Sequence, residues 1–144
     1  MIEIKIKLNN LNSIIPTKAT VGSAGYDIFS SEDKVLMPGK FDSISTGISI
    51  ELPEGYEAQV RPRSGLAFKH GVTVLNSPGT IDSDFRGEIK VLLINHSEKE
   101  FYIERGMRIA QLIVSSLVSL SFVTIDSLSD SNRGIGGFGS TGYK

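Results

Sequence analysis

The chain has 144 residues, 40% of them hydrophobic, which predicts one domain large enough to bury a core without disulfides. It contains no cysteine, which excludes thiol nucleophiles and cysteine-bound zinc. The formal net charge of −1 gives no broad positive field, so we expect no nucleic-acid partner. No apolar stretch approaches membrane-spanning length and no signal segment opens the chain, so we expect a cytoplasmic protein with no membrane contact.

Period-2 alternation of apolar and polar residues begins at residues 2–7, Ile-Glu-Ile-Lys-Ile-Lys, and is typical of a half-buried strand. Short strands with frequent turn signals predict an all-β domain, a β-sandwich or jelly-roll. The only helical candidate is a turn or two around residues 65–69. Further alternation lies at 48–52, 56–60 and 109–113, denser apolar runs lie at 72–75, 89–94 and 117–125, and turn residues such as Pro38-Gly39 and Pro53-Glu54-Gly55 separate them.

The end of the chain differs in composition from the rest. Residues 126–133, Asp-Ser-Leu-Ser-Asp-Ser-Asn-Arg, are polar and separate the last apolar run from the glycine-rich end. We therefore expect residues 1–125 to form a single β domain, and residues 126–144 to form a linker and a glycine-rich arm. A tail on such a tether can reach beyond its own core, even onto a neighbouring subunit.

The glycine-rich end reads Arg-Gly-Ile-Gly-Gly-Phe-Gly-Ser-Thr-Gly from residue 133 to 142. Gly134 to Gly139 match G-x-G-x-x-G, but no helix can follow, and Ser140 stands where a P-loop has lysine, so both nucleotide motifs are excluded. A disordered tail is one interpretation. The other is a flap that orders over a nucleotide, because the Arg133 guanidinium suits phosphate and the Phe138 ring suits a base.

Two further stretches carry charged residues in unusual settings. In Ala-Gly-Tyr-Asp-Ile-Phe-Ser, residues 24–30, Asp27 is either an edge-strand or turn carboxylate or a functional group. In Arg-Pro-Arg-Ser-Gly-Leu-Ala, residues 61–67, two arginines, a hydroxyl and a glycine indicate either a phosphate site or a solvated basic turn.

Two more stretches place polar side chains within apolar surroundings. Residues 76–91, Asn-Ser-Pro-Gly-Thr-Ile-Asp-Ser-Asp-Phe-Arg-Gly-Glu-Ile-Lys-Val, are expected to form the two arms of a hairpin. Asn76 is a base-reading amide or a turn residue, and Asp82 is a functional carboxylate or an Asx-turn cap. In Arg-Ile-Ala-Gln-Leu-Ile, residues 108–113, Gln111 is a cross-strand residue or a ligand contact.

Taken in this order, the five stretches resemble the five motifs of the trimeric deoxyuridine triphosphatase family, the dUTPases, over residues 24–142. The resemblance implies a jelly-roll-like β-clip and a homotrimer with a mobile C-terminal arm. It implies hydrolysis of dUTP to dUMP and pyrophosphate by attack of water on the α-phosphate. That reaction keeps dUTP low and supplies dUMP for dTMP synthesis.

The resemblance also implies the catalytic and phosphate-binding residues. Asp82 matches the general base, which contributes about 10²–10⁴-fold to such a reaction. Most of the remainder is electrostatic, from a Mg²⁺ ion on the triphosphate that Asp27 holds through its water shell. The residues expected to contact phosphates are Arg63, Ser64, Gly65 and Gln111.

Asn76 matches the family's uracil-reading residue, and the backbone around Thr80, Ile81 and Lys90 is expected to complete base recognition. Phe85 departs from the family pattern, which usually has tyrosine beneath the deoxyribose. The phenyl ring is expected to exclude a ribose 2′-hydroxyl, but the hydrogen bond of the phenol is lost.

In the arm, Arg133 is expected to meet the γ-phosphate and Phe138 to cover the uracil. Gly139, Ser140 and Thr141 are expected to wrap the phosphates of a site between two other subunits. Two alternatives stay open at this point. One is a dCTP deaminase of the same superfamily, and the other is a non-catalytic nucleotide sensor or interaction module that keeps the pocket.

Overall fold

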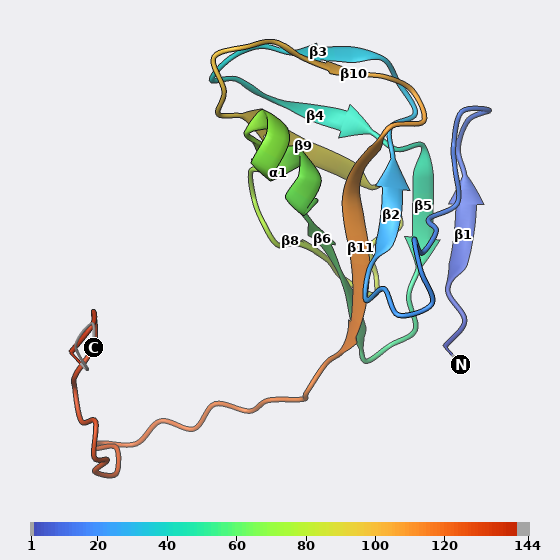
Figure 1. Cartoon of the computed structure of the whole chain (residues 1–144). Coiled ribbons are helices and arrows are strands. Elements are labelled where there is room, and N and C mark those ends of the chain that lie inside the picture. The colour runs from blue at the N-terminus through green and yellow to red at the C-terminus, as the bar shows by residue number, and fades with distance from the viewer. Residues whose placement is uncertain (1, 141–144) are drawn as a thin grey trace.

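The computed structural model describes residues 2–140, and in this part of the chain eleven strands and one short helix follow one another (Figure 1). The all-β prediction is confirmed, as is the helix expected around residues 65–69. The elements are β1 (Lys5–Leu8), β2 (Tyr26–Phe29), β3 (Lys34–Leu36), β4 (Phe41–Ser45), β5 (Ile48–Glu51), β6 (Tyr56–Arg61), α1 (Ser64–His70), β7 (Val72–Val74), β8 (Gly79–Ile81), β9 (Lys90–Asn95), β10 (Phe101–Ile103) and β11 (Arg108–Ser116).

The strands form four antiparallel sheets. The largest has the order β2-β11-β6-β8, and the next has the order β4-β9-β7. The two-stranded sheets are β1-β5 and β10-β3. β11 is central to the largest sheet because Leu112 pairs with Tyr26 of β2 on one side and with Val60 of β6 on the other.

The core lies where the inner faces of these sheets meet. Alternate residues of β5, β6 and β9 are buried, as the period-2 patterns predicted, because successive side chains of a strand point to opposite faces. α1 adds one buried residue, Leu66. No helix among residues 2–140 has the length and apolar character needed to cross a membrane.

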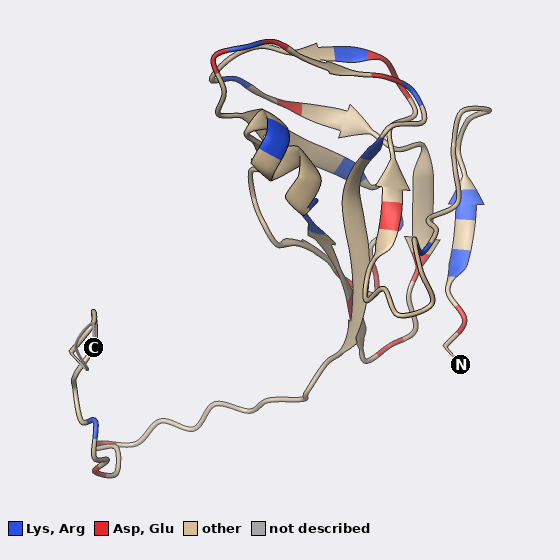
Figure 2. Ribbon diagram, viewed as in Figure 1, with Lys and Arg blue, Asp and Glu red and all other residues tan. Residues whose placement is uncertain are grey.

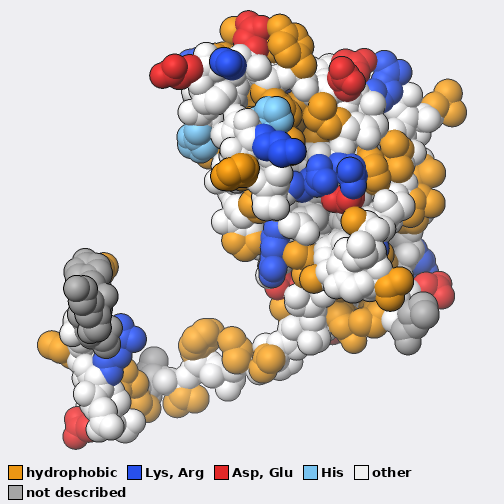
Figure 3. Space-filling view, in the orientation of Figure 1, with side chains coloured by type: hydrophobic (Ala, Val, Ile, Leu, Met, Phe, Trp, Pro, Cys, Tyr) orange, Lys and Arg blue, Asp and Glu red, His pale blue; other side chains and the backbone are white. Residues whose placement is uncertain are grey.

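The apolar run 117–125 does not form the expected strand. β11 ends at Ser116, and the last backbone hydrogen bond from the tail to the domain runs from Leu117 N to Gly55 O, at 2.8 Å. The chain then leaves the domain, and no sheet edge formed by residues 2–140 lies beside it (Figure 1). Its apolar side chains are therefore exposed, Phe122 by 94%, and they line the tail in Figure 3.

The first strand is also shorter than expected. The alternation begins at residue 2, but β1 begins at Lys5 and pairs only with β5. Ile4 and Ile6 pack against the core, whereas Ile2 is half exposed. The alternation thus predicted the buried face of this segment better than it predicted the bounds of the strand.

Asn95 is a fully buried polar side chain at the end of β9 that joins three segments. Its amide nitrogen donates to Leu36 O at 3.0 Å and to Lys99 O at 2.7 Å. Its amide oxygen accepts from the backbone N and the hydroxyl of Ser97, at 2.9 and 2.8 Å. The side chain thereby holds β3 and the loop before β10 against β9.

We expect Asn95→Ala to lower the free energy of unfolding by about 2–4 kcal/mol, because two carbonyls lose their donor and an unsatisfied buried group costs about 1–3 kcal/mol. Urea unfolding at one fixed protein concentration measures this change. Ser97→Ala is the control, since it removes the hydroxyl bonds to Asn95 and to the Lys99 backbone but leaves the Asn95 carboxamide with its two carbonyl acceptors. Equal stability of Asn95→Ala and the wild type would contradict the assignment.

Candidate active site

Residues 76–91 do not form the expected paired hairpin. β8 pairs with β6, whereas β9 pairs with β4 and β7, so the two arms belong to different sheets. A cavity of about 340 Å³, the β8–β9 cavity, lies between them. Its lining includes all six sequence-predicted residues of this segment, namely Asn76, Thr80, Ile81, Asp82, Phe85 and Lys90.

The β8–β9 cavity suits a flat ring with hydrogen-bonding edges. β8 is the last strand of its sheet, so the backbone groups on its outer side have no strand partner among residues 2–140. Asn76 lies just before β8, and Gly79 leaves it room, because a Cβ on that glycine would lie 3.2 Å from the Asn76 amide nitrogen. A carboxamide beside an open strand edge can both donate to and accept from a base.

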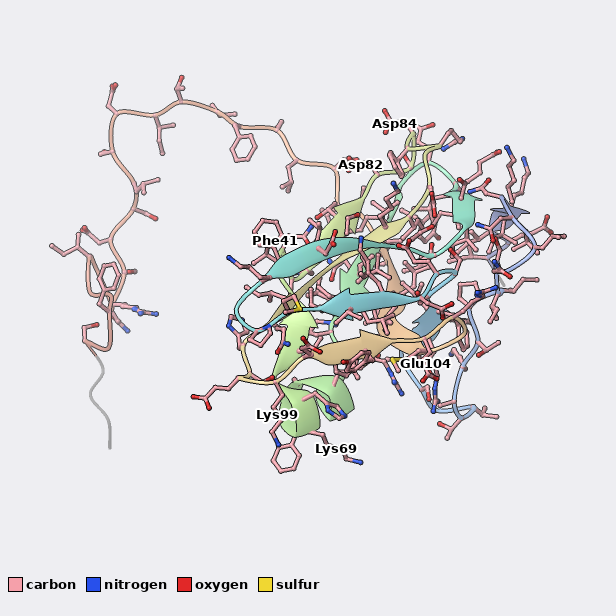
Figure 4. The ribbon with its side chains drawn as sticks, turned by 90° about the horizontal axis from the view of Figure 1, so that it is seen from above. Phe41, Lys69, Asp82, Asp84, Lys99 and Glu104 are labelled. Atoms are coloured by element: carbon pink, nitrogen blue, oxygen red, sulfur yellow. The ribbon has the colours of Figure 1, made fainter. Side chains whose placement is uncertain are left out.

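Asp82 follows the last residue of β8 and is exposed, and Figure 4 shows it near Asp84, away from Lys69 and Lys99. Its backbone carbonyl accepts from Phe85 N at 3.2 Å, which closes a turn. Its carboxylate accepts no hydrogen bond from the described part of the chain, so the Asx-turn interpretation is excluded. A carboxylate with free lone pairs can orient a water molecule.

The Phe85 ring lies against Gly87. A Cβ on Gly87 would lie 2.6 Å from the ring atom Cζ, closer than real Cβ contacts come. The Arg86 guanidinium fixes the same turn by donating to Ser83 O at 2.6 Å and to Phe85 O at 2.9 Å. The ring is 43% exposed, so one part of it is open to a ligand in the cavity.

A second cavity of about 310 Å³, the Asp27 cavity, brings together the other polar residues that the sequence singled out: Asp27, Arg63, Ser64, Gly65 and Gln111. β2 supplies Asp27, β11 supplies Gln111, and the remaining three lie where β6 leads into α1. Segments far apart in the sequence meet here because β11 pairs with both β2 and β6. Open space lies above Gly65, so a ligand can approach its backbone closely.

Asp27 is ion-paired with two arginines. Its carboxylate lies 3.1 Å from Arg63 Nε and 3.2 Å from Arg108 Nη1, and its side chain is only 13% exposed. Figure 2 shows this acidic position on β2 beside the basic start of β11, and Figure 3 shows basic side chains around acidic atoms on the same face. Arg63 Nη1 also donates to Arg108 O at 3.0 Å. The cavity therefore presents the oriented guanidinium group of Arg63, which suits phosphate oxygens.

Arg108 is an ion-pair partner of Asp27 that the sequence reasoning missed. It opens the stretch around Gln111, so its place in that motif was the available signal. Its ion pair with Asp27 depends on the register of β11 against β2, in which Arg108 pairs with Phe29 and an irregularity follows. A register irregularity of this kind cannot be read from residue types.

Gln111 is oriented by its neighbours. Its Nε2 donates to Pro62 O at 2.9 Å, which links β11 to the turn before Arg63. A Cβ on Gly25 would lie 2.5 Å from Gln111 Oε1, so a larger residue at position 25 would displace the Gln111 side chain. The side chain is thus half-buried with a satisfied donor, and its oxygen faces Gly25.

The residues of the Asp27 cavity fit a magnesium ion only together with a polyphosphate. Residues 2–140 contain no cluster of three His, Asp or Glu side chains that could hold a metal ion. One carboxylate beside arginines is a weak site for a bare cation. Mg²⁺ in nucleotide sites commonly keeps several waters and is held by one or two carboxylates plus substrate phosphates, and Asp27 suits that arrangement.

The structure does not bring the arm to either cavity. Arg133, Phe138, Gly139 and Ser140 lie in the tail, far from the sheets of their own chain (Figure 1), and Thr141 lies outside the described residues. Within the tail, Arg133 Nε donates to Gly136 O at 2.8 Å. Phe138 has a left-handed φ of 49° and a fully exposed ring. The expected contacts of these residues with a nucleotide stay predictions.

The first cavity has an open strand edge with a carboxamide and an exposed carboxylate, and the second is lined by arginine. This arrangement is expected of a β-fold nucleotide-binding protein. Known proteins agree with this class. The family model dUTPase matches residues 12–142. The chain belongs to the dUTPase family.

Individual relatives cover nearly the whole chain. The deoxyuridine 5′-triphosphate nucleotidohydrolase of Clostridium tetani is 57% identical over 139 residues, which are 96% of either chain. The enzyme of the same name from Nautilia profundicola is 54% identical over 97% of this chain and 99% of its own. Among solved structures, the Staphylococcus bacteriophage 80alpha dUTPase with dUpNHpp has a TM-score of 0.89 at 28% identity, covering 97% of this chain and 98% of that chain.

We expect Gly25→Ala to weaken tripolyphosphate binding about tenfold, a loss of about 1.4 kcal/mol, because the added methyl displaces Gln111 from its place beside Pro62. Calorimetric titration measures the dissociation constant. Gly22→Ala is the matched control, since nothing lies within 4 Å of a Cβ at that position. Unchanged affinity in Gly25→Ala would remove Gln111 from the phosphate site.

Proposed function

We propose that this dUTPase hydrolyses dUTP to dUMP and pyrophosphate by in-line attack of a water molecule that Asp82 orients and deprotonates. dUTP hydrolysis is the activity of the family to which the chain belongs. The observation that carries the residue assignment is the sorting of the polar groups into two cavities. One holds Asn76, Asp82 and Phe85, and the other holds Asp27 and Arg63.

Uracil binds in the β8–β9 cavity. The Asn76 amide and the backbone of Thr80, Ile81 and Lys90 pair with the edge of the base. Cytosine presents the opposite pattern of donors and acceptors, and such a mismatch is worth about 10⁴–10⁵ in selectivity. The extra methyl of thymine is excluded only by lack of room, which is worth about 10². Rejection of thymine therefore depends on how closely the walls of the cavity are held.

The deoxyribose lies on the Phe85 ring. The ring excludes a 2′-hydroxyl because it occupies the space that the hydroxyl needs, and an apolar face offers it no hydrogen bond. Phenylalanine, in place of the tyrosine usual in the family, supplies the face without the phenol oxygen. The half-exposed ring beside Gly87 supports this role.

The triphosphate binds in the Asp27 cavity, where Arg63, Ser64, Gly65 and Gln111 contact its oxygens. Asp27 would hold a Mg²⁺ ion on this triphosphate through the water shell of the ion, and the ion would supply charge neutralisation at the reacting phosphate. The guanidinium of Arg63 is oriented by Asp27 before substrate arrives, so its alignment needs no reorganisation during the reaction.

The active enzyme is a homotrimer in which the arm closes over a site formed by two other subunits. Three features support this proposal. The base and phosphate residues of one chain line two separate cavities, and the arm does not reach either of them in its own chain. The exposed apolar segment 117–125 also needs cover, since monomers rarely expose contiguous apolar surface of this kind.

In the trimer, Arg133 meets the γ-phosphate and Phe138 covers the uracil, while Gly139, Ser140 and Thr141 wrap the phosphates. The glycines allow the backbone to lie close to the ligand and to open again for product release. The enzyme works in the cytosol, where it keeps dUTP low and supplies dUMP for dTMP synthesis.

We expect Asp82→Asn to lower kcat for dUTP by about 10²–10⁴-fold with little change in KM, because the amide still fits the site but cannot accept the proton. Pyrophosphate release from dUTP, dTTP, dCTP and UTP, with and without Mg²⁺, measures both activity and selectivity. If the protein were a nucleotide sensor, both the wild type and Asp82→Asn would bind dUTP without releasing pyrophosphate. A deaminase would release ammonia from dCTP.

We expect a chain that ends at Asn132 to keep its fold and assembly and to lose nearly all activity. Circular dichroism and sedimentation report the fold and the assembly, and pyrophosphate release reports the activity. Phe138→Ala in the full chain is the companion variant. It keeps Arg133 and removes only the ring, so it should raise KM for dUTP. A fully active truncated chain would contradict the role of the arm.

A further inference from the structure

One wall of the β8–β9 cavity is tied to the turn between β4 and β5. The Glu88 carboxylate, which lines the cavity, accepts hydrogen bonds from the Ser45 hydroxyl and from Gly47 N, the latter at 2.8 Å. The next residue is held from the same turn, because Thr46 Oγ1 donates to Ile89 O. Ile89 N in turn donates to Ile48 O at 2.8 Å.

The turn that holds Glu88 is itself fixed. Gly47 is buried and has a left-handed φ of 69°, a conformation that favours glycine. A Cβ there would lie 2.3 Å from Ser13 Oγ, and the Ser13 hydroxyl donates to Gly47 O at 2.6 Å. The Gly47 amide is therefore a donor in a set position, and it sets the position of the carboxylate that accepts from it.

Glu88 is half-buried and ionised in this setting. Burial alone would raise its pKa, but the donors Ser45 and Gly47, aided by the charge of Lys90, hold the pKa of this carboxyl below its ordinary value. Hydrogen bonds to a charged acceptor are stronger than neutral ones. The link between the turn and the cavity wall is thus a strong one.

The opposite wall is held differently. β8 pairs with β6, in which Thr80 faces Gln59 and Ile81 faces Ala58, and Ile81 is buried in the core. The width of the cavity therefore depends on the attachment of β8 to β6 and on the attachment of the Glu88–Lys90 wall to β4 and the β4–β5 turn. Loss of the Glu88 carboxylate loosens the start of this wall, while the pairing of Lys90 with Ser45 and the backbone groups of β8 stay in place.

We infer that Glu88 is a positioning residue for base selectivity: its bonds to Ser45 and Gly47 hold the Ile89–Lys90 backbone at the distance from β8 that admits uracil and excludes the 5-methyl of thymine. The inference rests on the proposed binding of uracil in this cavity. Selectivity against a methyl group depends on space, so a looser wall weakens it more than it weakens selectivity against cytosine.

Glu32 provides a matched control within the same network. Its Oε1 accepts from Ser45 N at 2.7 Å, so it holds the same turn residue as Glu88. Glu32 does not line the β8–β9 cavity. Removal of Glu32 should therefore loosen the turn and lower stability, but it does not release the wall of the cavity directly.

The test compares Glu88→Ala, Glu88→Gln, Ser45→Ala and Glu32→Ala by kcat/KM for dUTP and for dTTP, at a temperature where each is folded by circular dichroism. We expect Glu88→Ala to lower the dUTP-to-dTTP selectivity about tenfold, chiefly through KM. Glu88→Gln should recover most of it, because its amide oxygen still accepts from Gly47 N. Ser45→Ala should fall between them, and Glu32→Ala should keep the wild-type ratio.

Unchanged selectivity in Glu88→Ala and Ser45→Ala would overturn the inference, and so would an equal loss in Glu32→Ala. If Glu88→Ala does not fold, Ser45→Ala decides, since it removes one hydroxyl and leaves the carboxylate in place. The dissociation constants of dUMP and dTMP provide a readout independent of turnover. A wild type that binds dUMP over dTMP but releases no pyrophosphate would contradict the proposed reaction and leave the inference about Glu88 testable by binding alone.

Discussion

The assignment of β8 and β9 to different sheets is the constraint on which the site depends. Had these strands paired with each other, their backbone groups would have satisfied one another and closed the space between them. Because β8 instead ends one sheet and β9 belongs to another, a cavity remains with an open strand edge on one side. A base can then be read by main-chain groups, which no single side-chain substitution removes.

The two cavities differ in the charge of the side chains that line them. The Asp27 cavity presents the Arg63 guanidinium, which the Asp27 carboxylate orients, and this arrangement suits a polyphosphate. The β8–β9 cavity presents an exposed carboxylate, Asp82, which would be neutralised as a base if an arginine were paired with it. In the proposed mechanism, the separation of Asp82 from the arginines lets it serve as the base, while the arginine side chains contact the phosphates.

Strands with clear alternation were predicted well, because burial of one face leaves a period-2 signal, as in β5 and β6. Asp27, Asp82 and Gln111 could be singled out because each interrupts an apolar pattern, and the resemblance to the dUTPases supplied the other predicted residues that line the two cavities. Two features were not predictable from residue types. The partner choice of β8 and β9 is decided by tertiary packing, and the ion pair of Arg108 with Asp27 depends on an irregular register. The strand predicted for residues 117–125 is absent because an apolar sequence favours burial without specifying whether the same chain or another one buries it.

The exposed tail after β11 affects the newly synthesised chain before it assembles. A newly made subunit carries Val118, Phe122 and Val123 in an extended, open conformation, which is the kind of segment that associates without selectivity. Folding of the sheets alone does not remove this hazard. In the proposed trimer, assembly must outpace aggregation, so the rate of synthesis and the local abundance of further copies of the chain would set the yield of assembled protein.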